Sequence, residues 1–149
     1  AAGKVDEGHF RRKYADNSAT LFYNNGQIAY HGHYTSEQEG HGTAYFENGQ
    51  KSYQGDWKMG QQHGNGTEYF DNGQVKYEGG WKEDKRHGSG ILYFDDGQIS
   101  YQGGWERDQR NGSGTVYDGE TGNKTYEGQF RFDESPQCNS VRRHGSGTE

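Results

Sequence analysis

The chain has 149 residues, a size typical of one domain. Its net charge of −6 and its pI near 5.6 disfavour nucleic acid as a partner. Leu, Ile, Val and Phe together number only 16, too few for an ordinary aliphatic core. Aromatic residues nevertheless make up 15% of the chain, whereas disordered chains are poor in them. We therefore expect a folded protein whose buried area comes mainly from Tyr, Trp and Phe.

A unit of about 24 residues recurs along the chain. Each copy opens on Tyr-x-Gly-x-aromatic, passes through a polar loop to Gly-x-Gly, and ends at Asn-Gly or Asp-Gly. The opening tyrosines of the regular copies are 23, 24, 24 and 25 residues apart: Tyr30, Tyr53, Tyr77, Tyr101 and Tyr126. The sequence thus predicts a repeat array over 6–149, with units starting near 6, 30, 53, 77, 101 and 126 and an insertion at about 131–143. Residues 1–5 form a flank, and because the chain lacks an initiator Met and stops inside a unit, we expect a piece of a longer protein.

Each unit is predicted to form two short strands joined at its Asn-Gly or Asp-Gly pair. Such pairs favour two-residue type I′ turns, since that turn needs positive φ at both central positions. They occur at Asn25-Gly26, Asn48-Gly49, Asn72-Gly73 and Asp96-Gly97. A turn at Asn72-Gly73 would pair Phe70 with Val75, Glu68 with Tyr77 and Gly66 with Gly79.

Glycine inside these strands has a predicted packing role. A strand glycine lets a ring lie over bare backbone, so Gly64, Gly66 and Gly79, with Gly88 and Gly90, should leave slots for Tyr and Trp rings. We expect the rings to stack as a ladder on one face. Twelve strands spaced about 4.8 Å apart would form a twisted ribbon about 58 Å long.

The regular copies resemble the MORN family (membrane occupation and recognition nexus). The match is carried by Tyr77-Glu-Gly-Gly-Trp81, Lys82, Arg86-His-Gly-Ser-Gly90 and Asp96-Gly97. Departures lie near the ends: Asp6 replaces Tyr, Asn17 and Ala19 replace the glycines, and Phe130 replaces Trp. The resemblance implies an all-β fold, an open single-layer antiparallel sheet of stacked β-hairpins that is elongated and twisted.

Similar arrays occur in cytoskeletal and ciliary scaffolds, in proteins bridging two membranes, and beside lipid kinase or lysine methyltransferase domains. The resemblance therefore implies several contexts for a repeat array and no chemistry of its own. No catalytic domain of either kind is visible in this sequence.

Histidines and glycines are the candidates for a metal site, a phosphate-binding loop or a catalytic centre. His63, His87 and His144 occupy one repeat position, and successive copies should lie about 10 Å apart, too far to share a zinc ion bound at about 2 Å. We expect this histidine to brace the loop before Gly-x-Gly; His31 and His33 could chelate, but no third ligand is evident. Gly88-Ser-Gly90 lacks the Lys-Ser/Thr of a phosphate-binding loop. We expect no enzyme, no catalytic residues, no metal and no cofactor.

Charge separates the two edges of the predicted ribbon. Acidic residues gather at the Asn-Gly edge: Glu47, Asp71, Asp95, Asp96, Asp118 and Glu120. The opposite edge is mixed but carries the basic residues Lys58, Lys82, Lys85, Arg86, Arg107, Arg110, Arg142 and Arg143. These edges are either solvated loops or a basic surface for an acidic partner or anionic lipid.

We predict a non-catalytic scaffold module that binds proteins within a larger assembly, cytoplasmic and plausibly ciliary (axonemal, radial-spoke-like) or cytoskeletal. The alternatives are a peripheral membrane module that binds anionic phospholipid, and a regulatory array fused to an enzyme. Open edge strands make self-association plausible, and the single Cys138 favours a reducing compartment. The predicted partner contacts are Trp57, Trp81, Trp105, Lys82, Arg86, Arg107, Arg110, Arg142 and Arg143.

Overall fold

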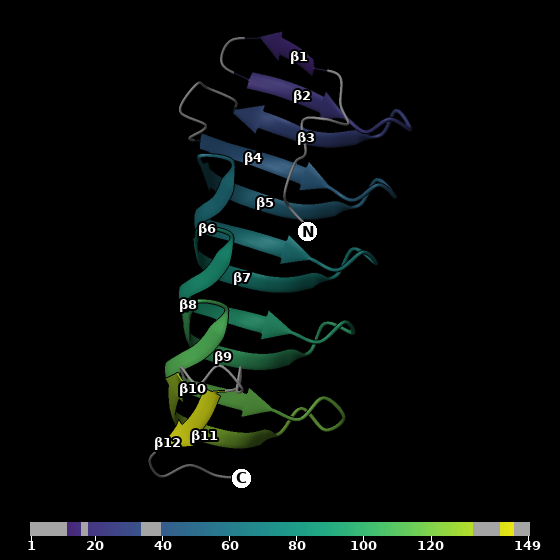
Figure 1. Ribbon diagram of the computed structural model, residues 1–149. Coiled ribbons are helices and arrows are strands. Elements are labelled where there is room, and N and C mark those ends of the chain that lie inside the picture. Colours follow the sequence, from purple (N-terminus) through teal and green to yellow (C-terminus); the bar gives the residue numbers. More distant parts are fainter. Residues whose placement is uncertain (1–11, 16–17, 34–39, 133–140, 145–149) are drawn as a thin grey trace.

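The computed structural model describes residues 12–15, 18–33, 40–132 and 141–144, and these form one antiparallel sheet without a helix (Figure 1). Its twelve strands follow chain order, each paired with the next. They are β1 (Arg12–Ala15), β2 (Ser18–Phe22), β3 (Ile28–His33), β4 (Gly40–Tyr45), β5 (Lys51–Lys58), β6 (Gln61–Tyr69), β7 (Val75–Lys82), β8 (Lys85–Tyr93), β9 (Ile99–Glu106), β10 (Gln109–Tyr117), β11 (Lys124–Phe132) and β12 (Val141–His144). The first and last strands lie at opposite ends, so the sheet stays open, which confirms the predicted fold class.

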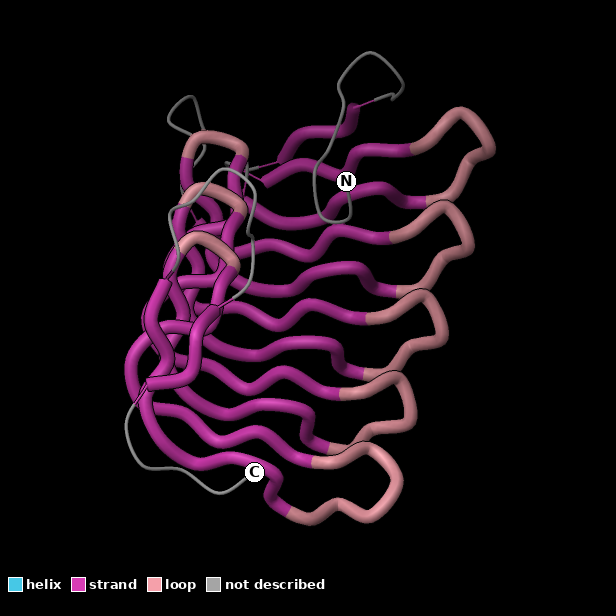
Figure 2. Tube along the Cα trace, turned by 60° about the horizontal axis from the view of Figure 1, so that its bottom comes forward, coloured by secondary structure: helices cyan, strands magenta, loops and turns pink. Residues whose placement is uncertain are grey.

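The central strands bend partway along their length (Figure 2). The bend coincides with register shifts between Gly55 and Trp57 and between Gly79 and Trp81. The bend divides the sheet into two arms. We name the part that ends at the Asn-Gly loops the loop arm, and the part that ends at the short turns 58–61, 82–85 and 106–109 the tip arm.

The short turns at the end of the tip arm are the type I′ turns of this protein. Both central residues have positive φ: 51° and 67° at Glu83 and Asp84, and 49° and 67° at Arg107 and Asp108. A two-residue hairpin with this twist matches the twist of its strands. The chain thus adopts type I′ turns at the edge opposite to the one that the Asn-Gly pairs predicted.

The Asn-Gly loops have a different geometry. Phe70 N–H donates to the Gln74 carbonyl over 2.8 Å, Gly73 N–H donates to the Phe70 carbonyl over 3.0 Å, and only Gly73 has positive φ. This is a three-residue loop, a type I turn followed by a bulge glycine. The prediction of a type I′ turn here is wrong because Asn72 Oδ1 accepts the Gln74 N–H over 2.9 Å, which supports the wider turn.

The wider loop changes one strand pair and leaves the others. Glu68 pairs with Tyr77 and Gly66 with Gly79, as predicted, but Tyr69 rather than Phe70 lies opposite Val75. The shift arises from a bulge between Glu68 and Tyr69.

The glycines serve two purposes. A Cβ at Gly66 would stand 2.1 Å from the Tyr53 hydroxyl, which confirms the predicted slot, whereas at Gly79 the nearest atom is the Ser89 carbonyl at 2.4 Å. Gly64 and Gly88 are not slots: both have positive φ, and nothing lies within 4 Å of a Cβ at Gly88. The first glycine of Gly-x-Gly therefore sets backbone conformation, and the second admits a ring.

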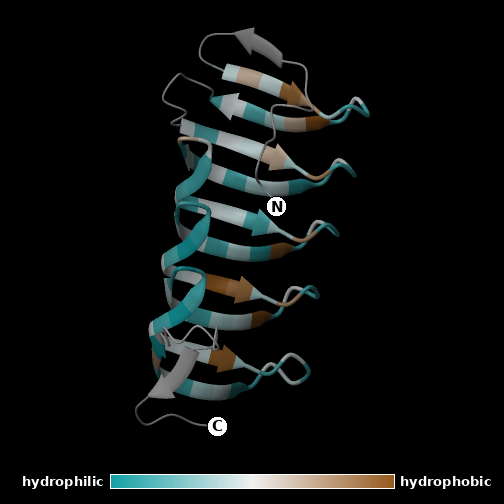
Figure 3. Cartoon of the chain, in the orientation of Figure 1, coloured by the Kyte–Doolittle hydropathy of each residue, from teal (hydrophilic) through white to brown (hydrophobic). Residues whose placement is uncertain are grey.

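Aromatic rings form the core along the inside of the bend. The buried hydrophobic residues are mostly tyrosine and tryptophan. The residues of highest hydropathy lie in short stretches of the strands next to the Asn-Gly loops (Figure 3). The cluster comprises Ala19, Leu21, Tyr30, Ala44, Tyr53, Trp57, Tyr77, Trp81, Tyr101, Trp105, Tyr126 and Phe130. The expectation of an aromatic core is confirmed.

Candidate interaction surfaces

The buried rings form one uninterrupted ladder. The Trp81 ring lies between those of Tyr53 and Tyr77, with centroids 5.5 and 5.2 Å away and planes 88° apart in both pairs. The same edge-to-face contact recurs from Tyr30 to Tyr126. Such contacts stabilise beyond area burial by about 0.5–1.5 kcal/mol each. The predicted ladder is confirmed, with rings packed edge to face.

Hydrogen bonds to backbone carbonyls fix the polar end of every tyrosine and tryptophan in the ladder. Tyr77 Oη donates to the Gly80 carbonyl over 3.0 Å, and Trp81 Nε1 donates to the Gly66 carbonyl over 3.1 Å. Burial raises the pKa of Tyr30 and of Tyr101 to about 12. These phenols therefore remain neutral donors at physiological pH.

The three tryptophans predicted as partner contacts are part of this ladder. Trp57 is 7% exposed, and Trp81 and Trp105 are each 5% exposed. Their burial argues against direct contact with a partner, because their rings already pack against the chain's own tyrosines.

Two of the predicted basic contacts also face the ladder. The Arg86 guanidinium lies 4.5 Å from the centroid of the Trp105 ring, and its Nε is 3.1 Å from Asp108 Oδ1. Arg110 lies 5.2 Å from the centroid of Phe130. Both arginines thus cover the inner side of the ladder as cation–π partners.

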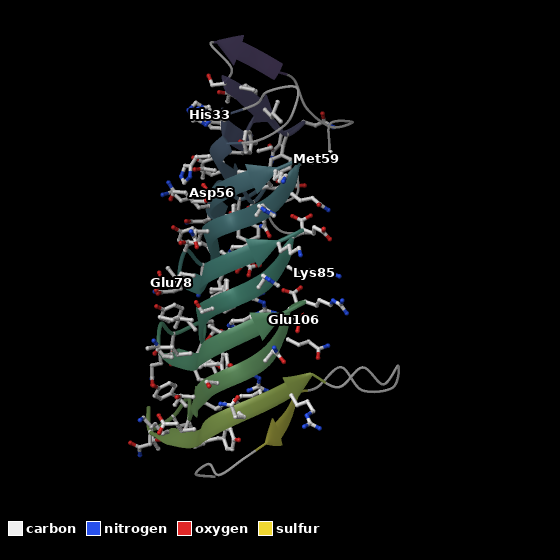
Figure 4. The ribbon with its side chains drawn as sticks, turned by 90° about the vertical axis from the view of Figure 1, so that its left-hand side faces the viewer. His33, Asp56, Met59, Glu78, Lys85 and Glu106 are labelled. Atoms are coloured by element: carbon white, nitrogen blue, oxygen red, sulfur yellow. The ribbon has the colours of Figure 1, made fainter. Side chains whose placement is uncertain are left out.

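The remaining basic candidates are divided between the tips and the last strand. Lys82 and Arg107 are exposed at the tip arm, where Lys85, Met59 and Glu106 also project (Figure 4). Arg142 and Arg143 lie in β12, opposite Arg131 and Phe130, and their side chains are outside the described residues. Two of these four residues thus lie at the tips and two in the last strand.

Aspartates at the tips tie consecutive units together. Asp84 Oδ1 accepts the Gln62 N–H over 2.7 Å, and the Asp84 N–H donates to the Gln62 carbonyl over 3.1 Å. Asp108 makes the same pair of contacts with Arg86. Sequence reasoning missed this contact, although an acid recurs at this repeat position; the counterpart in the preceding unit is Gly60.

Histidines make local contacts. His31 Nδ1 is 2.8 Å from Thr20 Oγ1, His33 Nδ1 accepts the His41 N–H over 3.1 Å, and His41 Nδ1 is 3.3 Å from Asp56 Oδ1. In the described part of the chain no three His, Cys, Asp or Glu side chains are placed to hold a metal ion. His63 and His87 make no side-chain hydrogen bond within the described ranges, so the predicted loop brace is not seen there.

One carboxylate lies on the ladder side of the loop arm. Glu68 is paired with Tyr53 on one neighbouring strand and with Tyr77 on the other. The residue at the same repeat position in the next unit is Leu92. Burial raises the pKa of Glu68, although Lys76 and Arg86 oppose the shift. Sequence reasoning missed this carboxylate because the other units have Ala44, Leu92 and Val116 at the same repeat position.

The outer face, away from the ladder, is shallowly hollowed along the bend. A hollow of about 370 Å³ is lined by His41, Gln54, Asn65, Thr67, Glu78 and three glycines. A similar hollow of about 380 Å³ is lined by Gln102, Ser113, Thr115, Glu127, Gln129 and two glycines. Asp56 and Glu78 project along this side of the ribbon (Figure 4).

The ladder and the stacked hairpins define an open, single-layer repeat protein. A MORN repeat model matches residues 53–75, 77–99 and 101–120, and a MORN repeat variant matches residues 15–35. The chain belongs to the MORN repeat family, which identifies a repeat module that binds proteins or membranes. A comparison with curated proteins gave no match. No helix of the described residues is long and apolar enough to cross a membrane.

Proposed function

We propose that this chain is a non-catalytic scaffold module that binds other proteins within a larger cytoplasmic assembly, such as a ciliary or cytoskeletal one. The observation that carries the proposal is the continuous ladder from Tyr30 to Tyr126. It joins successive hairpins into one extended body and leaves both edges and the outer face to the surroundings. The ciliary or cytoskeletal setting rests on family resemblance alone.

Membrane binding is the competing function, and the positions of the basic residues weigh against it. Binding to anionic lipid needs several basic residues close together. Arg86 is already paired with Asp108, and at the exposed tips the bases alternate with Glu83 and Glu106. The tips therefore offer a mixed charge pattern, which suits a protein partner better.

Two measurements with the full chain test the proposal. Capture of the native assembly, followed by mass spectrometry, should recover the same partner proteins reproducibly. Flotation with phosphatidylcholine vesicles containing phosphatidylserine should leave the protein unbound. Flotation that depends on phosphatidylserine and disappears in a Lys82→Glu/Arg107→Glu variant would overturn the proposal, as would the absence of any reproducible protein partner.

A further inference from the structure

Four tyrosines of the loop arm form a row that the ladder does not use. Tyr45, Tyr69, Tyr93 and Tyr117 occupy the same position in successive units, and all four are half-buried. The two central tyrosines lie opposite aliphatic residues, Tyr69 opposite Val75 and Tyr93 opposite Ile99. The outer two lie opposite lysines, Tyr45 opposite Lys51 and Tyr117 opposite Lys124. We name the line Tyr69, Val75, Tyr93, Ile99 and Tyr117, across β6–β10, the outer stripe.

The outer stripe lies on the face away from the ladder. Side chains alternate along a strand, so Tyr69 shares its face with Thr67 and not with Glu68, which pairs with the ladder tyrosine Tyr77. The Tyr93 hydroxyl donates to the carboxylate of the exposed Glu78. That contact places the edge of the stripe beside the outer hollows.

The spacing of the tyrosines matches one ligand conformation. They recur on every second strand, about 9.6 Å apart, and one turn of a polyproline II helix contains three residues and rises about 9.3 Å. A segment in that conformation, lying along the ribbon, would present equivalent residues to Tyr69, Tyr93 and Tyr117. Aromatic rows are the usual docking surface for proline rings. We propose that the outer stripe docks a proline-rich segment of a partner protein.

Hydrogen-bond donors and charged side chains beside the outer stripe indicate which residues the proline-rich segment should contain. A polyproline II backbone has no internal hydrogen bonds, so its carbonyls need donors, and Thr67, Gln102 and Thr115 line the hollows beside the stripe. On the outer face of the loop arm, Glu78 is exposed and accepts a hydrogen bond from the Tyr93 hydroxyl. Glu127 lines the second hollow, and its carboxylate lies 3.2 Å from Lys124 Nζ. The segment should therefore carry Arg or Lys beside its prolines, which complements Glu78 and the net charge of −6.

This inference rests on the proposed scaffold function and names the class of partner. The direct test is fluorescence anisotropy of the full chain with a labelled peptide of three Arg-Pro-Pro repeats. The control peptide replaces every proline with alanine and keeps the charge. We expect the proline peptide to bind at least tenfold more tightly than the control.

Variants locate the site. Tyr93→Ala should weaken binding of the proline peptide at least tenfold, whereas Tyr93→Phe, which keeps the ring, should stay within about threefold. Lys82→Ala, at the exposed tip, should leave binding within twofold. Amide chemical-shift changes in the unsubstituted chain give a readout that does not depend on folding of the variants, and they should centre on β6–β10.

Several results would overturn the inference. If the alanine peptide bound as tightly as the proline peptide, the interaction would depend on charge and not on proline. If the amide chemical-shift changes centred on the tips, the peptide would bind outside the outer stripe. Displacement of the peptide by phosphatidylserine vesicles would make the stripe a membrane contact. Failure of the proline peptide to bind would reject the inference and leave the scaffold function intact, because assembly capture tests that function separately.

Discussion

The two edges of the ribbon close the same repeat with different turns. At the tips, Glu83 and Asp84 both adopt positive φ, whereas in the Asn-Gly loops only the glycine does. Each edge carries a hydrogen bond between units: Asp84 accepts from Gln62 of the preceding unit, and Asn48 Nδ2 donates to the Asp71 carbonyl of the following unit over 3.1 Å. The contrast teaches that contacts between neighbouring units, and not the turn residues alone, fix each edge.

The largest effect is expected where the two arms meet. In Gly90→Ala the new methyl group would collide with the Tyr77 ring, whose hydroxyl lies 2.2 Å from its position. Because Tyr77 is fully buried and cannot move aside, we expect a loss of about 3 kcal/mol in the free energy of unfolding. Urea denaturation measures it.

Gly88→Ala is the matched control in the same motif. Its methyl group meets open space, so the cost is that of a positive φ of 79°, about 1 kcal/mol. Equal losses in the two variants would show that ring packing at the bend does not hold the arms together.

The next effect tests the tip edge. Asp108→Ala removes the acceptor for the Arg86 N–H, at 2.7 Å, and for its Nε, while the strained backbone remains. Since the aspartate is partly exposed, we expect a loss of about 2 kcal/mol. Asp108→Asn keeps an acceptor and should lose less. Asp108→Gly should fall between them, because glycine relieves the positive φ; thermal unfolding ranks the three.

The strand pairing of the loop arm was largely predictable, whereas its turn type and the contacts of the tip arm were not. Alternation and the glycine spacing sufficed to pair Gly66 with Gly79 and to place the ladder, because those features depend on neighbouring strands. The type of the Asn-Gly turn depends on a local hydrogen bond, in which Asn72 Oδ1 accepts the Gln74 N–H. The place of Arg86 depends on the bend, which brings its guanidinium over Trp105 of the following unit. A single repeat does not contain this contact with Trp105, so the sequence alone indicated a free charge at Arg86.

A smaller effect on stability is expected at Glu68, where the next unit has Leu92 at the same repeat position. Glu68→Leu copies Leu92 and should stabilise the protein by about 1 kcal/mol at pH 7, because a half-buried carboxylate is replaced by an apolar side chain. The pKa of Glu68 is raised on folding, so its contribution favours the folded state below its ordinary pKa and is lost as the pH rises through the folded value.

The gain from Glu68→Leu should therefore shrink as the pH falls from 7 towards 4. Urea denaturation at both pH values measures the change. Glu47→Leu, at an exposed loop position, should alter stability by less than about 0.5 kcal/mol at either pH. A gain that is independent of pH would mean that Glu68 is solvated in the folded state.

The smallest effect compares backbone strain at the two edges directly. Glu83 has a φ of 51°, and a non-glycine residue there costs about 1–2 kcal/mol, while glycine costs about 0.5–1 kcal/mol in chain entropy. Glu83→Gly should therefore stabilise the protein by about 0.5 kcal/mol. Gly73→Ala, at a φ of 90° in the opposite edge, should destabilise it by about 1 kcal/mol. Changes of opposite sign in the free energy of unfolding, measured by parallel urea titrations, would show that the tip edge contains backbone strain that the loop edge avoids. A loss of stability in Glu83→Gly would mean that the Glu83 side chain makes a contact that stabilises by more than the strain costs.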